Sequence, residues 1–156
     1  MTRSARLLAM LGLSGICTFF IISCTTMKTT AVRPFSAAQA APPIGPYSHG
    51  VECQGRMLFL SGQIPLRADG SMVSGTITEE THQVFENIRT ILASQGADVS
   101  SIVKTTVFLK NMGDFTEMNA VYAEQMGQHR PARSAVEVAR LPKDARVEIE
   151  VIACVP

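Results

Sequence analysis

The amino-acid sequence predicts an α+β domain in which two helices pack on one face of a mixed β-sheet. Two observations support this expectation. Short runs that alternate between apolar and polar residues, or are rich in β-branched residues, are typical of strands, and two longer segments carry apolar residues at helical spacing. In chain order these segments read ββαβαββ, an order that favours a helical layer on one side of a sheet.

The first two predicted strands follow a segment without apolar periodicity. Residues 25–43 are rich in Thr, Ala and Pro, which favours a tether and an extended arm over a second domain. Residues 49–53 and 56–61 then have the composition of strands on either side of a Gln54-Gly55 turn. Residues 65–75 follow as a loop.

Two amphipathic helices separated by one strand come next. Thr78 is expected to cap the first helix and Gly96 to end it. Residues 102–110 form a strand rich in β-branched residues, and Asp114 begins the second helix. The apolar faces of the two helices consist of Val84, Phe85, Ile88, Ile91 and Leu92 in the first, and Phe115, Met118, Tyr122 and Met126 in the second.

The last two predicted strands carry a pair of charges that suggests chemistry. Residues 131–138 and 147–152 alternate and are joined by a short polar link, which predicts a hairpin with Arg133 and Glu148 on the sheet face that the helices leave open. A guanidinium can grip a carboxylate through two parallel hydrogen bonds, and a carboxylate can orient or deprotonate water. The pair therefore suggests a small-acid hydrolase site, although two solvated charges on an open sheet face fit the same spacing equally well.

The beginning of the chain is predicted to direct the protein to the cell envelope. Arg3 and Arg6 precede an apolar run, residues 7–22, whose length suits the hydrophobic region of a secretory signal. The run ends in Ile21-Ile22-Ser23-Cys24, which looks like a bacterial lipobox. We therefore expect residues 1–23 to be a lipoprotein signal peptide and Cys24 to carry the lipid. An uncleaved anchor and a signal peptide cut elsewhere remain open, and both also place the domain outside the cytoplasm.

Composition limits the other expectations. With 156 residues, 46% of them hydrophobic and 17% charged, the chain has room for one folded domain, which we place at residues 44–156 after a tether and arm at 24–43. A formal net charge of +1 offers no electrostatic footprint for nucleic acid. The cysteines at 53 and 154 are expected to be two buried, inert thiols rather than a disulfide. The three histidines are scattered, so no metal site is expected.

Several short motifs follow one another along the predicted domain. They are Ile44-Gly45-Pro46-Tyr47-Ser48, Ser61-Gly62-Gln63-Ile64-Pro65, Asn87-Ile88, Val103-Lys104-Thr105-Thr106-Val107-Phe108, Asn119-Ala120-Val121-Tyr122, Pro131-Ala132-Arg133-Ser134, Leu141-Pro142-Lys143-Asp144 and Val147-Glu148-Ile149-Glu150. With these motifs the chain resembles the RidA (YjgF/YER057c/UK114) family of imine and enamine deaminases.

The resemblance implies a fold, a reaction and a set of site residues. The fold is chorismate-mutase-like and usually trimeric, with ligand clefts between subunits. The reaction is the hydrolysis of reactive 2-imino acids, tautomers of enamines, to 2-keto acids and ammonia without a cofactor. By resemblance Arg133 binds the substrate carboxylate and Glu148 positions the attacking water, while the cleft is lined by Tyr47, Ser61, Gly62 and Asn119. Many family members carry Cys where this chain has Ala135, which leaves the substrate preference open.

The expected hairpin also bears on how a site could be assembled. In a regular hairpin about 13 Å would separate Arg133 from Glu148 along the strands, which is long for one small substrate and its water. We therefore expect the working Arg and Glu to come from adjacent chains of the trimer. Two other functions stay open: a non-catalytic module that binds small carboxylates or acts like a chaperone, and an RNA-active protein, which the near-neutral charge disfavours.

Overall fold

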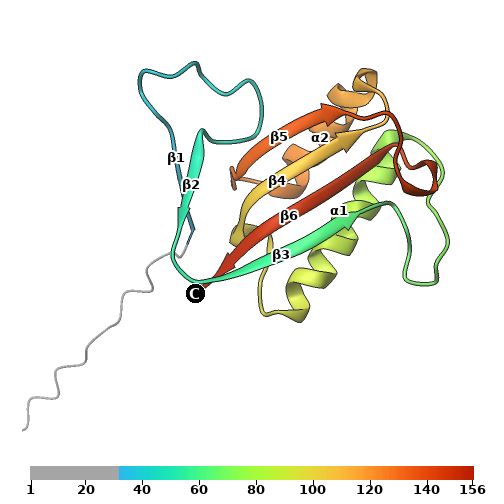
Figure 1. Cartoon of the computed structure of the whole chain (residues 1–156), viewed down its shortest axis with the longest axis horizontal. Coiled ribbons are helices and arrows are strands. Elements are labelled where there is room, and N and C mark those ends of the chain that lie inside the picture. Colours follow the sequence, from blue (N-terminus) through green and yellow to red (C-terminus); the bar gives the residue numbers. More distant parts are fainter. Residues whose placement is uncertain (1–31) are drawn as a thin grey trace, which may run out of the picture.

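The computed structural model describes residues 32–156, and the predictions made for residues 1–23 and Cys24 lie outside this range. Figure 1 shows a four-stranded sheet in the order β3-β6-β4-β5 and a separate two-stranded ribbon, β1-β2. The strands are β1 Val32–Phe35, β2 Gly50–Cys53, β3 Arg56–Gln63, β4 Ile102–Leu109, β5 Ala132–Glu137 and β6 Val147–Val155; the helices are α1 Ile77–Ser94 and α2 Phe115–Met126.

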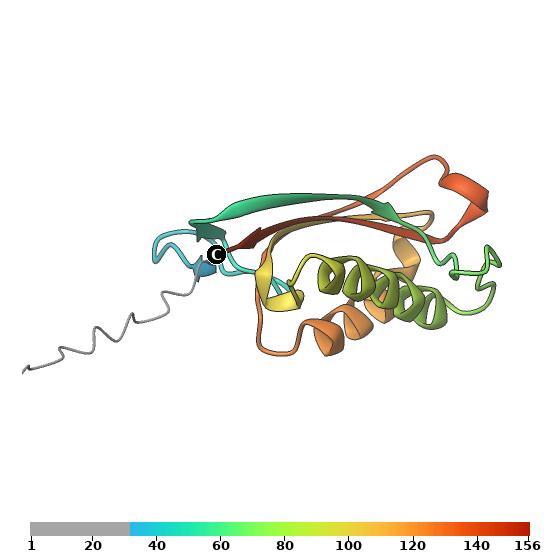
Figure 2. The same cartoon turned by 90° about the horizontal axis from the view of Figure 1, so that it is seen from below.

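Both helices cover the same face of the four-stranded sheet, as Figure 2 shows, so the predicted α+β class is confirmed. The core lies between the two layers. Strands β4 and β6 alternate between buried and partly exposed residues along most of their length, because their odd-numbered side chains from 105 to 109 and from 147 to 153 face the helices. The fully buried helix side chains that meet them include Val84, Phe85, Ile88, Leu92, Met118 and Tyr122.

The N-cap of helix α1 lies two residues earlier than predicted. Thr76, not Thr78, accepts the backbone N–H of Glu79 with its side chain, and the Glu79 carboxylate accepts the Thr76 N–H at 2.8 Å. This reciprocal capping box satisfies two backbone donors that would otherwise have no partner. Gly96, with φ of 69°, follows the last turn as predicted, because a left-handed conformation there suits glycine.

The predicted C-terminal hairpin is wrong. β5 pairs with β4 in parallel, β6 pairs with β4 antiparallel, and β4 therefore lies between them. A β4-α2-β5 crossover returns the chain to the edge of the sheet, and the link after β5 then passes the end of β4 to reach its other side. The alternating pattern identified both strands but held no information on their neighbours.

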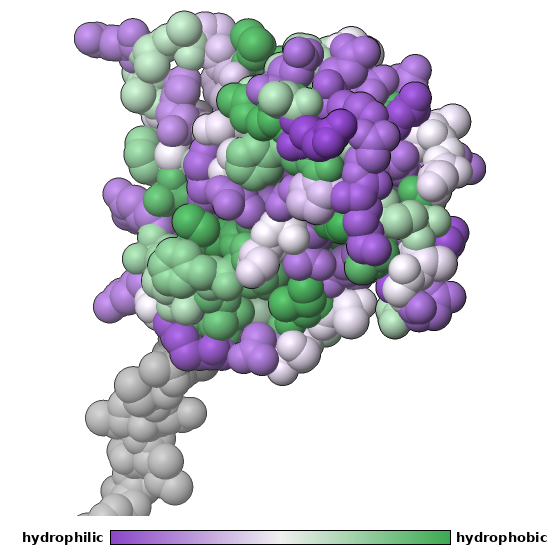
Figure 3. Space-filling model, turned by 45° about the vertical axis from the view of Figure 1, so that its right-hand side comes forward, coloured by the Kyte–Doolittle hydropathy of each residue, from purple (hydrophilic) through white to green (hydrophobic). Residues whose placement is uncertain are grey.

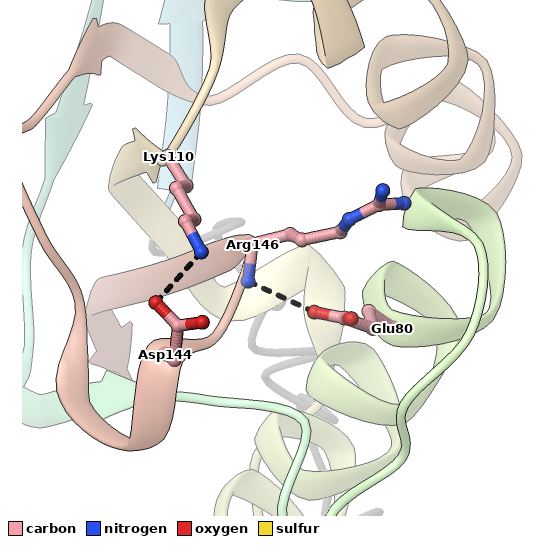
Figure 4. A network of polar contacts seen from close by, with 4 residues as sticks. All are labelled: Glu80, Lys110, Asp144 and Arg146. Atoms are coloured by element: carbon pink, nitrogen blue, oxygen red, sulfur yellow. Dashed lines mark hydrogen bonds and ion pairs between the residues drawn. The ribbon is translucent and has the colours of Figure 1, made fainter.

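Polar contacts fix this link against the rest of the fold (Figure 4). The buried Glu80 of α1 accepts the backbone N–H of Arg146 at 3.0 Å. Lys110, just after β4, donates to Asp144 at 2.6 Å. The link is thereby held to α1 and to the end of β4, beside which β6 begins with Val147.

The ribbon accounts for two differences from expectation. Residues 32–35, predicted as part of an extended arm, pair antiparallel with β2, and the ribbon packs on one end of the sheet, where Val32 meets Val103 and Cys154. This packing joins Cys53 to Cys154 in a disulfide, so the expectation of two free thiols is wrong. The partners stand 101 residues apart in the chain, and their proximity depends on how the ribbon docks. Neither helix within residues 32–156 has the length and apolar character needed to cross a membrane.

Candidate functional site

Arg133 lies on the edge strand β5 with its guanidinium turned toward the helix side of the sheet. Its Nη1 donates to the Asn119 side-chain oxygen at 2.7 Å. Its Cζ lies 4.6 Å from the ring centroid of Tyr122, 5.2 Å from that of Tyr47 and 5.7 Å from that of Phe115. Aromatic faces attract a cation, so the three rings and one amide hold the guanidinium in a fixed orientation.

The electrostatics of this pocket preserve the charge of Arg133 and keep Tyr122 neutral. Burial lowers the pKa of Arg133 below its usual 12.5, while interactions with Tyr122 and Tyr47 raise it. Burial raises the pKa of Tyr122 to about 12, and its hydroxyl shares a hydrogen bond of 2.8 Å with the Thr105 hydroxyl. A neutral phenol beside a charged guanidinium leaves a net positive pocket at neutral pH.

Most N–H donors of the Arg133 guanidinium have no hydrogen-bond partner among the described residues. Of the residues that the structure describes, Asn119 alone forms a hydrogen bond to it, and no carboxylate lies within ion-pair distance. A guanidinium carries five N–H donors in a planar fork, which matches the geometry of a carboxylate. The arrangement can therefore accept a small carboxylate in two parallel hydrogen bonds.

Glu148 belongs to a second group of predicted residues, on the open face of the sheet. It registers with Phe108, which points away from the helices, and it contacts β3 at Gly62. A Cβ added to Gly62 would lie within 1.8 Å of a Glu148 carboxylate oxygen, so only glycine allows this close approach. Ser61 precedes Gly62 at an irregularity in the β3-β6 pairing. Gly62, Ser61 and Glu148 thus form one group.

The two groups lie on opposite faces of the sheet within one chain. Arg133 registers with Thr105, whose side chain is buried beneath the helices, and Glu148 registers with Phe108 on the other face. Two strand spacings and three residues separate the two positions, about 14 Å between Cα atoms. The prediction that both charges occupy the open face is wrong for Arg133.

The open face carries exposed apolar side chains around its charges. Met57 is 40% exposed, Phe59 76% and Val136 42%. Figure 3 shows hydrophobic surface gathered over the lower part of the molecule and hydrophilic surface over the upper part. Lys104 donates to Ser134 at 2.7 Å on the same face, and burial lowers the pKa of Lys104 while Glu150 raises it. A mixed surface of this kind is typical of an interface between subunits.

Sequence reasoning assigned Phe115 and Tyr122 only to the core of the domain. Both also form walls of the Arg133 pocket. They stand at spacings of four and three from Asn119 on α2, so they share its helix face, and this spacing was the available signal. A groove of about 630 Å³ between α1 and the loop after β3 includes Gly62 but neither Arg133 nor Glu148. Residues 32–156 contain no cluster of three or more His, Cys, Asp or Glu side chains that could hold a metal ion.

Comparison with known proteins identifies the family. A family model described as Endoribonuclease L-PSP matches residues 38–155, most of the chain. The chain belongs to the RidA (YjgF/YER057c/UK114) family. A RutC family protein of Pyrococcus horikoshii is 51% identical over 115 residues, which cover 73% of this chain and 90% of that protein. The 2-iminobutanoate/2-iminopropanoate deaminase of Escherichia coli K12 is 45% identical over 124 residues, covering 78% of this chain and 96% of the enzyme.

Solved structures of RidA-family proteins share the fold. The crystal structure of the YjgF gene product of E. coli superposes with a TM-score of 0.62 at 41% identity, covering 80% of this chain and 99% of that one. The structure of E. coli TdcF with bound serine gives a TM-score of 0.62 at 38% identity, with coverage of 80% and 99%. The resemblance drawn from the motifs is thus confirmed at the level of family and fold.

Proposed function

We propose that the protein hydrolyses reactive 2-imino acids, the tautomers of enamines, to 2-keto acids and ammonia. The carbon of a protonated imine is already electrophilic, so the site must hold the neighbouring carboxylate, present a water to that carbon and let ammonia leave. In this proposal Arg133 binds the carboxylate, and Glu148 orients the water and accepts its proton as the C–O bond forms. Return of that proton to the nitrogen lets the C–N bond break and ammonia leave. No cofactor is required for these steps.

The observation that carries the proposal is the guanidinium of Arg133. Three aromatic rings and the Asn119 amide fix its position, while most of its donors remain free within the described residues. A structural arginine would be expected to have a carboxylate partner or several backbone acceptors. A fixed and uncompensated guanidinium instead provides a preorganised site for an anion.

The proposal requires more than one chain. Because Arg133 and Glu148 face opposite sides of one sheet, a small substrate cannot touch both within a single subunit. We propose a homotrimer whose subunits pack through their open faces, so that Glu148 of one chain completes the Arg133 pocket of the next. The exposed Met57, Phe59 and Val136 side chains would be buried in that assembly.

The relatives support this substrate class. The E. coli relative bears the name of a 2-iminobutanoate/2-iminopropanoate deaminase, and the TdcF structure contains serine, which also carries a carboxylate next to a nitrogen-bearing carbon. The family model bears the description of an endoribonuclease. A net charge of +1 does not favour a polyanionic substrate here.

The deciding experiment is a deaminase assay. 2-Iminopropanoate and 2-iminobutanoate are generated in situ by an amino-acid oxidase, and the decay of the imine is followed with and without the protein. We expect faster decay that is lost in Arg133→Ala. The absence of acceleration with small and branched imino acids, together with retained binding of 2-oxobutanoate, would instead support the alternative of a non-catalytic module that binds small carboxylates.

We also propose that the domain resides in the cell envelope, anchored through Cys24 after removal of residues 1–23. The motif Ile21-Ile22-Ser23-Cys24 after an apolar run supports this location. Two or three acyl chains would give stable anchoring, whereas one chain is marginal. Metabolic labelling with palmitate should mark the wild-type chain but not Cys24→Ala. Labelling that persists in the variant would exclude this anchor.

A further inference from the structure

His49 ties together the loop that joins β1 to β2. The backbone N–H of Ala37 donates to its Nδ1 at 2.9 Å, and its Nε2 lies 2.7 Å from the carbonyl oxygen of Ala41. A carbonyl oxygen can only accept, so Nε2 must carry a proton, while Nδ1 must offer a lone pair to the amide. The two contacts together require the neutral ring with its proton on Nε2.

Ser48 fixes the other end of the same segment. Its backbone N–H donates to the carbonyl of Pro131 at 3.1 Å, and its hydroxyl lies 2.6 Å from the carbonyl oxygen of Arg130. Ser48 is buried, at 8% exposure. Residues 42–47 therefore form a short loop held at one end by the start of β5 and at the other by His49.

This short loop borders the Arg133 pocket. The Tyr47 ring lies 5.2 Å from the guanidinium carbon, and its hydroxyl accepts the N–H of Ile44 at 3.2 Å. A Cβ on Gly45 would stand 2.8 Å from an Arg133 nitrogen, so the loop backbone lies directly against the guanidinium. Movement of the loop changes both the aromatic wall and the access to Arg133.

We propose that His49 is a positioning residue for the Arg133 pocket, which holds the loop at residues 37–47 in place only while its ring is neutral. Protonation of Nδ1 sets a ring N–H against the Ala37 N–H, 2.9 Å away, so the two groups must separate and the ring can no longer hold both Ala37 and Ala41 in their present positions. The pocket then binds a carboxylate less tightly. The effect of His49 on carboxylate binding rests on the proposed function, whereas its effect on the order of the loop does not.

The charged groups on the neighbouring elements do not compensate the protonation of the imidazole. On the adjoining ribbon, Arg33 and Glu52 pair with each other. On the β5 side, the Arg130 guanidinium donates to two backbone carbonyls, and Arg133 faces Tyr47. Within the described part of the chain, no hydrogen bond or ion pair joins His49 to a charged side chain. A positive ring therefore gains no partner in place of the amide it loses.

Two substitutions separate the hydrogen bonds from the titration. In His49→Gln the side-chain oxygen can accept the Ala37 N–H while the amide nitrogen donates to Ala41, and the group does not titrate. In His49→Leu both contacts are lost. His82→Gln, a histidine on α1 that hydrogen-bonds Gln125, serves as the matched control.

The experiment measures hydrogen–deuterium exchange of peptides covering residues 36–48 in the full chain, at pH 8 and 5.5, each corrected with an unfolded reference. Calorimetric titration with 2-oxobutanoate accompanies it. We expect residues 36–48 of both wild type and His82→Gln to be less protected from exchange at pH 5.5 than at pH 8. Both proteins should also bind 2-oxobutanoate about fivefold more weakly at the lower pH. His49→Gln should keep both, and His49→Leu should lack both at either pH.

Equal pH dependence in wild type and His49→Gln, or full protection in His49→Leu, would overturn the proposal. If no variant binds 2-oxobutanoate, the proposed function fails while the exchange pattern still decides the role of His49. Comparing wild type with His49→Gln also removes any contribution from Glu148, which is present in both.

Discussion

At the scale of single residues, the pocket of Arg133 combines a fixed orientation with unused donors. The rings of Tyr47, Phe115 and Tyr122 surround the guanidinium, and Asn119 occupies one of its N–H groups. This environment favours the planar, weakly hydrated cation of arginine over the compact ammonium of lysine. Binding of a carboxylate should therefore require arginine at position 133, and a positive charge alone should not be enough.

Arg133→Lys tests this point. The variant keeps the charge but loses the two-pronged contact with a carboxylate, and a charge-assisted hydrogen bond contributes on the order of 1.5 to 3 kcal/mol. We expect kcat/KM for 2-iminobutanoate to fall about tenfold to hundredfold. Kinetics close to wild type would show that Arg133 is only a structural cation.

Tyr122 should make the free energy of unfolding depend on pH in the alkaline range. Burial raises its pKa from 10.0 to about 12, so the unfolded chain loses this proton first as the pH rises. The free energy of unfolding should therefore fall between these two pH values, by up to about 2–3 kcal/mol. Urea unfolding at pH 8, 10 and 11 should show a steeper decline for wild type than for Tyr122→Phe. Parallel declines would contradict the assignment.

At the scale of elements, the crossover from β4 through α2 to β5 builds the pocket. It brings Phe115, Asn119 and Tyr122 on the helix over Arg133 on the returning strand. Thr105 on β4 anchors the hydroxyl of Tyr122 from below. The β1-β2 ribbon and its loop then close the remaining side with Tyr47, so the docking of the ribbon affects the site.

The Cys53–Cys154 disulfide should hold that ribbon in place. It closes a loop of 101 residues and joins β2 to the end of β6. Cys53→Ser is expected to lower the free energy of unfolding by about 2–4 kcal/mol. Urea unfolding with and without a reductant measures this, and the reductant should affect the wild type but not the variant. A wild type that is insensitive to reductant would mean that the disulfide does not form.

At the scale of the whole molecule, the decisive feature is that Arg133 and Glu148 face opposite sides of the sheet. One subunit therefore carries the two halves of the proposed site on opposite faces of its sheet, and neither half is a complete site. The open face, with its exposed Phe59, supplies the surface through which a second copy would complete them.

Mixed oligomers of Arg133→Ala and Glu148→Ala subunits test the shared site. Each variant alone should be inactive. In a random equal mixture, about a quarter of the clefts would receive both native groups if these come from different chains. Co-expression with two affinity tags, followed by the imine assay, measures the recovery. Mixtures as inactive as the single variants would place both groups in one chain.

The sequence by itself determined most of the elements and the set of candidate site residues. Periods of two and about 3.6 residues identified strands β2 to β6 and both helices, since these patterns depend on local side-chain geometry alone. The cap at Thr76 was missed by two residues because Thr78 offers a competing hydroxyl. The motifs shared with the RidA family identified the six candidate site residues, whose roles are proposals.

Only the tertiary structure decided which residues meet. The hairpin expected for residues 131–152 gave way to a strand order with β4 in the middle, because strand pairing depends on the crossover through α2 and on contacts distant in sequence. The same long-range packing turned Arg133 toward the helices and joined Cys53 to Cys154. Alternation fixes which residues share a face of one strand, but the face that points to the core is set by the packing of the whole sheet.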